Sequence, residues 1–124
     1  MKAFVKKWLG AAEEAAEVTP PRVDSNQRVY SIGDIHGRAD LLLELHSKIV
    51  ADAAGFDGPR CVVYLGDCID RGMHSRDVVD ELLDNPLPGF ESIYLMGNHE
   101  QTLLDFLQHP KVAQGWLNWG GRET

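Results

Sequence analysis

The sequence predicts an α/β fold in which a parallel sheet is assembled from βαβ units. Three short apolar runs, rich in β-branched and aromatic residues, occupy positions 28–32, 61–65 and 92–96, and a glycine follows each run. After each run, the apolar residues change to the spacing of an amphipathic helix. Strands that alternate with helices in this way are typical of right-handed crossovers and of a buried parallel sheet.

Three helices are expected, one after each strand. Their apolar stripes lie within residues 41–50, 78–83 and 103–107, where apolar side chains recur at helical spacing. Ser75 is a suitable N-cap for the second helix. Pro110 ends the third helix, because proline cannot continue one.

The first 27 residues are expected to stand apart from the domain. The apolar residues that would share one face of a helix there are Phe4, Val5, Trp8 and Leu9. Such a helix ends before the proline pair at 20–21, and polar residues follow it. We therefore expect an N-terminal helix and linker over residues 1–27 and one domain over residues 28–124.

Composition limits the classes of protein to which the chain can belong. Its 124 residues are 44% hydrophobic and 25% charged, which is ordinary for a globular domain and excludes a disordered or collagen-like chain. The net charge of −7 argues against a nucleic-acid partner. The sequence shows no apolar run near the ~20 residues that span a bilayer and no secretory signal. Cys61 and Cys68 are expected to be reduced thiols of a cytoplasmic protein.

Polar side chains follow each of the three strands, in loops that are rich in glycine. The loops are Gly-Asp-Ile-His-Gly at 33–37, Gly-Asp-Cys-Ile-Asp-Arg-Gly at 66–72 and Gly-Asn-His-Glu at 97–100. Since the carboxyl ends of parallel strands lie at one edge of a sheet, these side chains are expected to meet there. One Gly-Asp after a strand is a common turn, but three such loops with histidine or arginine indicate a functional site. The candidate residues are Asp34, His36, Asp67, Asp70, Arg71, Asn98 and His99.

These residue types suit the hydrolysis of phosphoesters with the help of metal ions. Mixed oxygen and imidazole ligands favour manganese, iron(II) or zinc, and Asp67 after the central strand can bridge two ions. Two ions ~3.5–4 Å apart clamp the attacking and leaving oxygens, and water held between them becomes hydroxide near neutral pH. Arg71 is suited to phosphate oxygens. His99 can protonate the leaving oxygen, with Asp70 holding its ring.

The three loops resemble the signature of the calcineurin-like metallophosphoesterases, and within them the phosphoprotein-phosphatase branch. The motifs are Gly-Asp-x-His-Gly, Gly-Asp-x-x-Asp-Arg-Gly and Gly-Asn-His-Glu, all intact and in order. The chain looks most similar to bacterial serine/threonine protein phosphatases and to the related symmetrical diadenosine tetraphosphate hydrolase. The resemblance covers Val29 to the C-terminus. It implies a four-layer αββα sandwich.

The resemblance also implies a role for each candidate residue. Asp34 and His36 would bind the first metal, Asp67 both metals, and Asn98 the second. His99 would be the general acid, oriented by Asp70. Arg71 would bind the phosphate of the substrate, with Asn98 beside it. Glu100, the last residue of the third motif, would be a structural partner.

The family is about twice as long as this chain, and two further histidines from later loops complete its second metal site. The sequence is therefore expected to be the N-terminal half of such a domain, incomplete at the C-terminus. The remaining histidines, His46, His74 and His109, are expected to lie on the surface.

The expected function is hydrolysis of phosphoserine and phosphothreonine monoesters with two divalent ions, manganese first, or else iron or zinc. Its partner would be a phosphoprotein or a phosphorylated small molecule. Two alternatives are a symmetrical diadenosine tetraphosphate hydrolase and a catalytically impaired fragment that binds metal or phosphate.

Overall fold

The computed structural model describes residue 22 and residues 24–124, so the expected N-terminal helix lies outside the described residues. The strands are β1 (Arg28–Ile32), β2 (Arg60–Tyr64) and β3 (Glu91–Tyr94). The helices are α2 (Ala39–Asp52), α3 (Ser75–Asp84) and α4 (Asn98–Gln108). A 3₁₀ turn (Pro110–Val112), the short α5 (Ala113–Trp116) and a π turn (Leu117–Gly121) end the chain.

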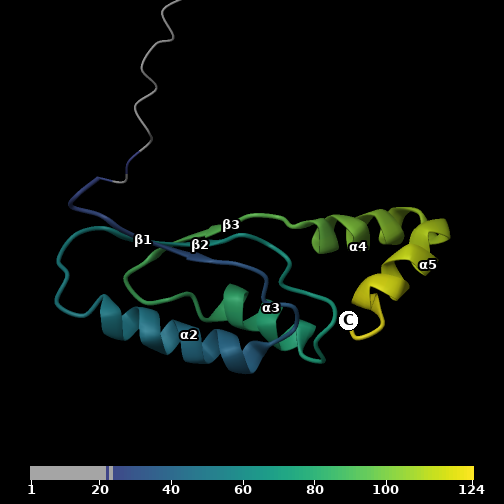
Figure 1. The fold of residues 1–124 in the computed structure, drawn as a ribbon, viewed down its shortest axis with the longest axis horizontal. Helices are drawn as coiled ribbons and strands as arrows, with labels where there is room; N and C mark the ends of the chain where they lie inside the picture. The colour runs from purple at the N-terminus through teal and green to yellow at the C-terminus, as the bar shows by residue number, and fades with distance from the viewer. Residues whose placement is uncertain (1–21, 23) are drawn as a thin grey trace, which may run out of the picture.

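The predicted α/β fold with a parallel sheet is confirmed. The described residues form one sheet in the order β1-β2-β3, and both pairs of strands are parallel. Helices α2 and α3 cover one face of this sheet, whereas α4 and α5 extend beyond the ends of the strands (Figure 1). The chain thus carries two βαβ units, and every strand ends at the same edge.

The core lies between the sheet and the helices α2 and α3. Its buried residues are Ile32, Ile35, Leu42, Ile49, Val62, Tyr64, Val78, Leu82 and Leu87. The ring of Tyr64 stacks on that of Tyr94, with centroids 5.1 Å apart. Only part of each expected stripe is buried, because each helix meets the sheet on one side; Leu41 and Leu83, for example, are exposed.

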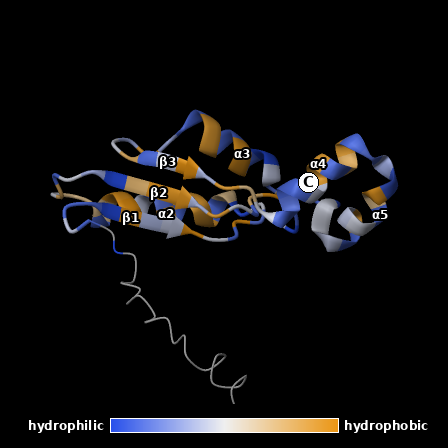
Figure 2. Ribbon diagram, turned by 90° about the horizontal axis from the view of Figure 1, so that it is seen from above, coloured by the Kyte–Doolittle hydropathy of each residue, from blue (hydrophilic) through white to orange (hydrophobic). Residues whose placement is uncertain are grey.

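Strand β3 and helix α4 bury fewer of their apolar side chains than the sequence predicts. Ile93 and Tyr94 in β3 are exposed, as are Leu104 and Leu107 in α4. Strand β3 lies at an edge of the sheet, and Figure 2 looks onto the sheet face that no described helix covers. The local sequence pattern therefore predicts these two elements correctly, but it does not predict that their apolar side chains are exposed.

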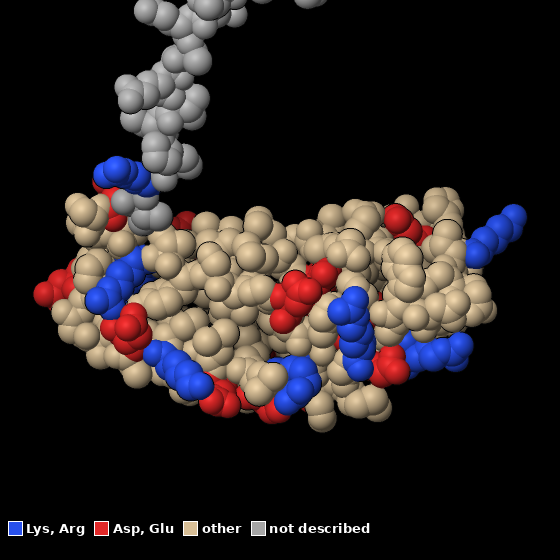
Figure 3. All heavy atoms as spheres, viewed as in Figure 1, with Lys and Arg blue, Asp and Glu red and all other residues tan. Residues whose placement is uncertain are grey.

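The face shown in Figure 3 has no patch that is only basic or only acidic, because basic and acidic side chains are interspersed along its edge. Among the described residues, several exposed charges are paired, such as Lys48 with Glu44 and Arg38 with Asp40. Among the described helices, none combines the length and the apolar character that crossing a membrane requires.

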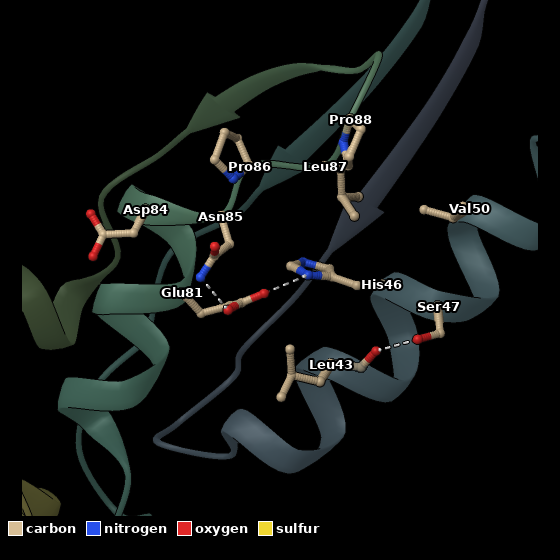
Figure 4. A pocket seen from close by; sticks show the side chains of 10 residues that line it. All are labelled: Leu43, His46, Ser47, Val50, Glu81, Asp84, Asn85, Pro86, Leu87 and Pro88. Carbon is tan, nitrogen blue, oxygen red and sulfur yellow. Dashed lines mark hydrogen bonds and ion pairs between the residues drawn. The ribbon is translucent and has the colours of Figure 1, made fainter.

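The expectation that His46 lies on the surface is wrong. Its side chain is buried at 5% exposure beneath an open hollow of about 750 Å³ between α2, α3 and the loop before β3 (Figure 4). Its Nε2 shares a hydrogen bond of 2.9 Å with the Tyr64 hydroxyl, and its Nδ1 lies 3.8 Å from Glu81 Oε1. A histidine can replace an aliphatic residue in the core here because the central strand supplies a polar partner.

This burial predicts that stability falls in mild acid. Loss of hydration lowers the pKa of His46 below its usual ~6.5, although Glu81 opposes the shift. The contribution of neutral His46 is complete above pH ~6.5 and is lost as pH falls through the lowered folded pKa. Urea midpoints between pH 5 and 8 should therefore fall toward low pH, and His46→Gln should flatten this slope. His109→Gln, at an exposed position, is the control; an equal effect of both substitutions would contradict the prediction.

Candidate active site

The first two loops are joined through their backbones at the carboxyl edge of the sheet. The amides of Ile35 and His36 both donate to the Asp67 carbonyl, at 3.0 and 2.9 Å, and the Gly37 amide donates to Cys68. An added Cβ at Gly37 would lie 2.5 Å from the Gly72 carbonyl oxygen. The glycines are therefore needed because the two loops approach each other too closely for a side chain.

Glu100 ties the third loop to the second. Its Oε2 accepts hydrogen bonds from the amides of Gly97 (2.9 Å) and Asp67 (2.8 Å), and its Oε1 accepts one from Cys68 (2.7 Å). The same carboxylate thus satisfies donors that precede α4 and donors of the loop after β2. This geometry agrees with the structural role that the resemblance implies for Glu100.

Backbone strain is concentrated in these loops. The non-glycine residues of positive φ in the described chain are His36 (46°), Asp67 (53°), Asp70 (70°) and Arg71 (66°). Each conformation of this kind costs about 1–3 kcal/mol and persists only where the surroundings impose it. All four are candidate site residues from the sequence, so the strain marks the same place that the motifs indicated.

His36 has the form of a metal ligand. Its Nδ1 donates to the Ile69 carbonyl at 2.9 Å, which leaves the lone pair on Nε2. That Nε2 is buried and has no hydrogen-bond partner, and the nearest carboxylate oxygen, Asp34 Oδ2, lies 3.6 Å away. An orphaned imidazole nitrogen beside carboxylates fits a divalent cation.

Asp67 lies at the N-terminus of α4, where the helix dipole favours a carboxylate. Its Oδ1 accepts a hydrogen bond of 3.0 Å from the His99 amide, and an added Cβ at Gly97 would collide with this oxygen. One ligand atom from each of His36, Asp67 and His99 lies within 4.8 Å of the others. These three side chains, from three separate loops, form the candidate metal cluster.

Two candidate ligands stand at the rim of this cluster rather than inside it. The Asp34 side chain is 65% exposed. Asn98, the first residue of α4, is also exposed. Their loops bring them to the same edge of the sheet, but the inner cluster is made of His36, Asp67 and His99.

Asp70 and Arg71 contact the two ring nitrogens of His99, so His99 belongs both to the metal cluster and to a second group made with Asp70 and Arg71. Asp70 is fully buried, and its Oδ2 accepts a hydrogen bond of 2.8 Å from His99 Nδ1. The Arg71 guanidinium donates to His99 Nε2 at 3.3 Å, so the proton of His99 resides on Nδ1. The rings of His36 and His99 meet edge to face at 4.7 Å, which connects the two groups.

Cys68 carries a protonated thiol at neutral pH when no metal is bound. Burial, with the charges of Glu100 and Asp67, raises the pKa of its thiol to about 11. Cys61 is a free thiol in the buried part of β2. The candidate cluster His36, Asp67 and His99 contains oxygen and imidazole donors, the mixture that the sequence predicts.

Two residues that contact Asp70 lie outside the three motifs, and the sequence pattern did not identify them. Trp116 Nε1 donates to Asp70 Oδ2 at 2.8 Å, and Thr124 Oγ1 donates to Asp70 Oδ1 at 2.7 Å. Trp116 is buried and stacks on Phe106, whereas Trp119 is 60% exposed. Ser75, expected as an N-cap, instead accepts a hydrogen bond from the Asp70 amide.

A relative of known name matches the same part of the chain. The chain is 34% identical over 85 residues to the protein named bis(5'-nucleosyl)-tetraphosphatase PrpE [asymmetrical] of Halalkalibacterium halodurans. The match covers 65% of this chain and 34% of that protein. The chain thus spans about a third of the length of this relative.

The family is shown by a match over most of the described residues. The sequence model described as calcineurin-like phosphoesterase matches residues 27–122, a range that contains β1 to α5 and all three loops. Proteins of this family bind divalent metals, and the His36, Asp67 and His99 cluster is a candidate site for one. The chain belongs to the calcineurin-like phosphoesterase family and carries part of a metallophosphoesterase domain.

Proposed function

We propose that residues 28–124 form the part of a phosphoester hydrolase that binds metal and phosphate, and that its substrates are phosphoserine and phosphothreonine monoesters. The observation that carries this proposal is the orphaned His36 Nε2 within the metal cluster, next to the hydrogen-bonded pair of Asp70 and His99. A cation site beside a positioned imidazole can supply the charge neutralisation and the proton transfer that assist hydrolysis of a phosphoester.

The metal would be held by Asp34, His36, Asp67 and Asn98. His99 is not assigned as a ligand, because both of its ring nitrogens already have hydrogen-bond partners. Oxygen and imidazole donors in this mixture suit manganese first, and iron or zinc next. When bound, divalent ions neutralise phosphate charge and activate water. Asp67 belongs to the loop of the central strand, which supports a position between two ions.

Arg71 and His99 would act on the substrate itself. The Arg71 guanidinium is exposed and presents a planar set of donors, which suits the oxygens of a phosphate. Its hydrogen bond of 3.3 Å to His99 Nε2 is long, so a phosphate can displace it. His99 Nε2, released from Arg71, would then bind a second proton and donate it to the leaving oxygen, while Asp70 accepts the hydrogen bond from Nδ1.

His99→Asn is expected to slow hydrolysis of phosphomonoesters by about 10²–10⁴-fold, because the proton donor is removed. The loss should be largest for phosphoserine peptides, whose alkoxide leaving group needs the proton, and smallest for p-nitrophenyl phosphate. Steady-state rates with Mn²⁺ measure both substrates. His109→Asn, at an exposed position, is the matched control, and an equal loss for the two substrates would contradict the role of His99.

A second substrate class is favoured by the similarity to a protein named as an asymmetrical bis(5'-nucleosyl)-tetraphosphatase. The same side chains could direct attack at phosphorus in diadenosine tetraphosphate. Hydrolysis rates of a phosphoserine peptide and of diadenosine tetraphosphate, compared with Mn²⁺ present, decide between the classes. ADP alone would indicate symmetrical cleavage, and ATP with AMP asymmetrical cleavage. Mn²⁺ binding without hydrolysis of either substrate would favour an impaired fragment that binds metal or phosphate.

A further inference from the structure

Asp70 is a fully buried carboxylate whose donors come from two distant parts of the chain. His99 Nδ1 and Trp116 Nε1 both donate to Oδ2 at 2.8 Å, and Thr124 Oγ1 donates to Oδ1 at 2.7 Å. A buried charge is tolerated only when hydrogen bonds replace its lost hydration. The segment of residues 116–124 therefore supplies donors that the three motif loops do not.

The same segment also holds the backbone at this position. Asp70 and Arg71 are two consecutive residues of positive φ. The Asp70 amide donates to Thr124 Oγ1 at 2.9 Å, and the Arg71 amide donates to the Gly120 carbonyl at 2.8 Å. Gly120 has a φ of 110°, and an added Cβ there would lie 2.6 Å from Arg71 Cγ. Contacts from residues 120 and 124, outside the loop at 66–72, thus hold the strained backbone of Asp70 and Arg71. A strained backbone persists only where its surroundings impose it.

We propose that Trp116 and Thr124 are positioning residues, which aim the Asp70 carboxylate at His99 and hold the proton of His99 on Nδ1. The inference rests on the proposed function: with Nδ1 protonated and bound to Asp70, Nε2 is the nitrogen that takes up a second proton and gives it to the leaving oxygen. With two oxygens held by two further donors, the carboxylate cannot rotate away from His99. The His99 ring in turn keeps Nε2 directed at Arg71 and the substrate side of the site.

Packing alone does not account for the polar atoms of these residues. The Trp116 ring stacks on Phe106 at 4.9 Å, a contact that phenylalanine could also make. The indole nitrogen points instead at Asp70. Trp119 lies in the same segment but is 60% exposed, so Trp119→Phe is a matched control for Trp116→Phe. Thr124→Val removes a hydroxyl at constant shape, and Thr124→Ser restores it.

The test is made on the ¹⁵N-labelled 124-residue chain at one fixed pH, without added metal. Two-bond ¹⁵N–¹H spectra of the His99 ring report which nitrogen carries the proton. The wild type should show one tautomer, protonated at Nδ1. Trp116→Phe and Thr124→Val should each produce a mixture of tautomers, whereas Thr124→Ser and Trp119→Phe should keep the single form. An unchanged tautomer in both Trp116→Phe and Thr124→Val would overturn the proposal.

A measurement on the wild type covers the case in which the variants fail to fold. The Trp116 indole proton should exchange with solvent at least about 10-fold more slowly than that of Trp119, since it is buried and bound to a carboxylate. Equal exchange rates would overturn the proposal as well. Neither spectrum depends on catalysis.

Hydrolysis then separates positioning from a general structural role. Trp116→Phe should lower kcat for phenyl phosphate by about 10-fold or more at unchanged KM, with a smaller loss for p-nitrophenyl phosphate. An equal loss for both substrates would assign Trp116 a purely structural role and overturn the proposal. A wild type that hydrolyses neither substrate would count against the proposed function, while the tautomer spectra would still decide the inference.

Discussion

Asp67→Asn is expected to weaken Mn²⁺ binding by about 100-fold or more. The asparagine keeps the shape of the side chain, tolerates the positive φ at this position and can still accept the hydrogen bond from the His99 amide. What it removes is the negative charge at the centre of the cluster. The loss of affinity should therefore come without unfolding.

Isothermal titration with Mn²⁺ measures this effect, and the number of ions bound per chain is read from the same data. Asp57→Asn makes the same charge change in an exposed loop and should leave the affinity unaltered. Two ions per wild-type chain would support the two-ion arrangement. One ion per chain would support only the metal position next to His36 and would contradict the second position. An affinity that Asp67→Asn does not change would refute the assignment of Asp67.

Glu100→Ala is expected to reduce the free energy of unfolding by about 3 kcal/mol. The substitution leaves the amides of Gly97, Asp67 and Cys68 without their acceptor, and unsatisfied donors of this kind cost about 1–3 kcal/mol each where they are buried. Partial access of water to these loops reduces the sum. Because small domains have only about 5–15 kcal/mol of stability, such a loss is large.

Urea denaturation followed by circular dichroism measures the change. Glu100→Gln retains one acceptor oxygen and should give an intermediate loss, since the three bonds use both carboxylate oxygens. Glu91→Ala removes an exposed carboxylate at the start of β3 and is the control. If Glu100→Ala and Glu91→Ala had the same small effect, the connection between the loops would not depend on Glu100.

The sequence by itself determined the parallel α/β plan and indicated the edge of the sheet at which the candidate site lies. The patterns that carry this information are local: an apolar run, a glycine, and a helical stripe, repeated three times. Because parallel strands end at one edge, the loops at 33–37, 66–72 and 97–100 had to converge there. The strained φ values of His36, Asp67, Asp70 and Arg71 coincide with residues that the motifs had already indicated.

Only the tertiary structure decided which side chains are enclosed and which groups meet. His46 is buried because Tyr64 of the central strand offers it a partner, and no local pattern distinguishes it from a surface histidine. Trp116 and Thr124 reach Asp70 from 46 and 54 positions away. Such contacts depend on how α4 and the turns after it pack, which is a property of three-dimensional arrangement rather than of spacing along the chain.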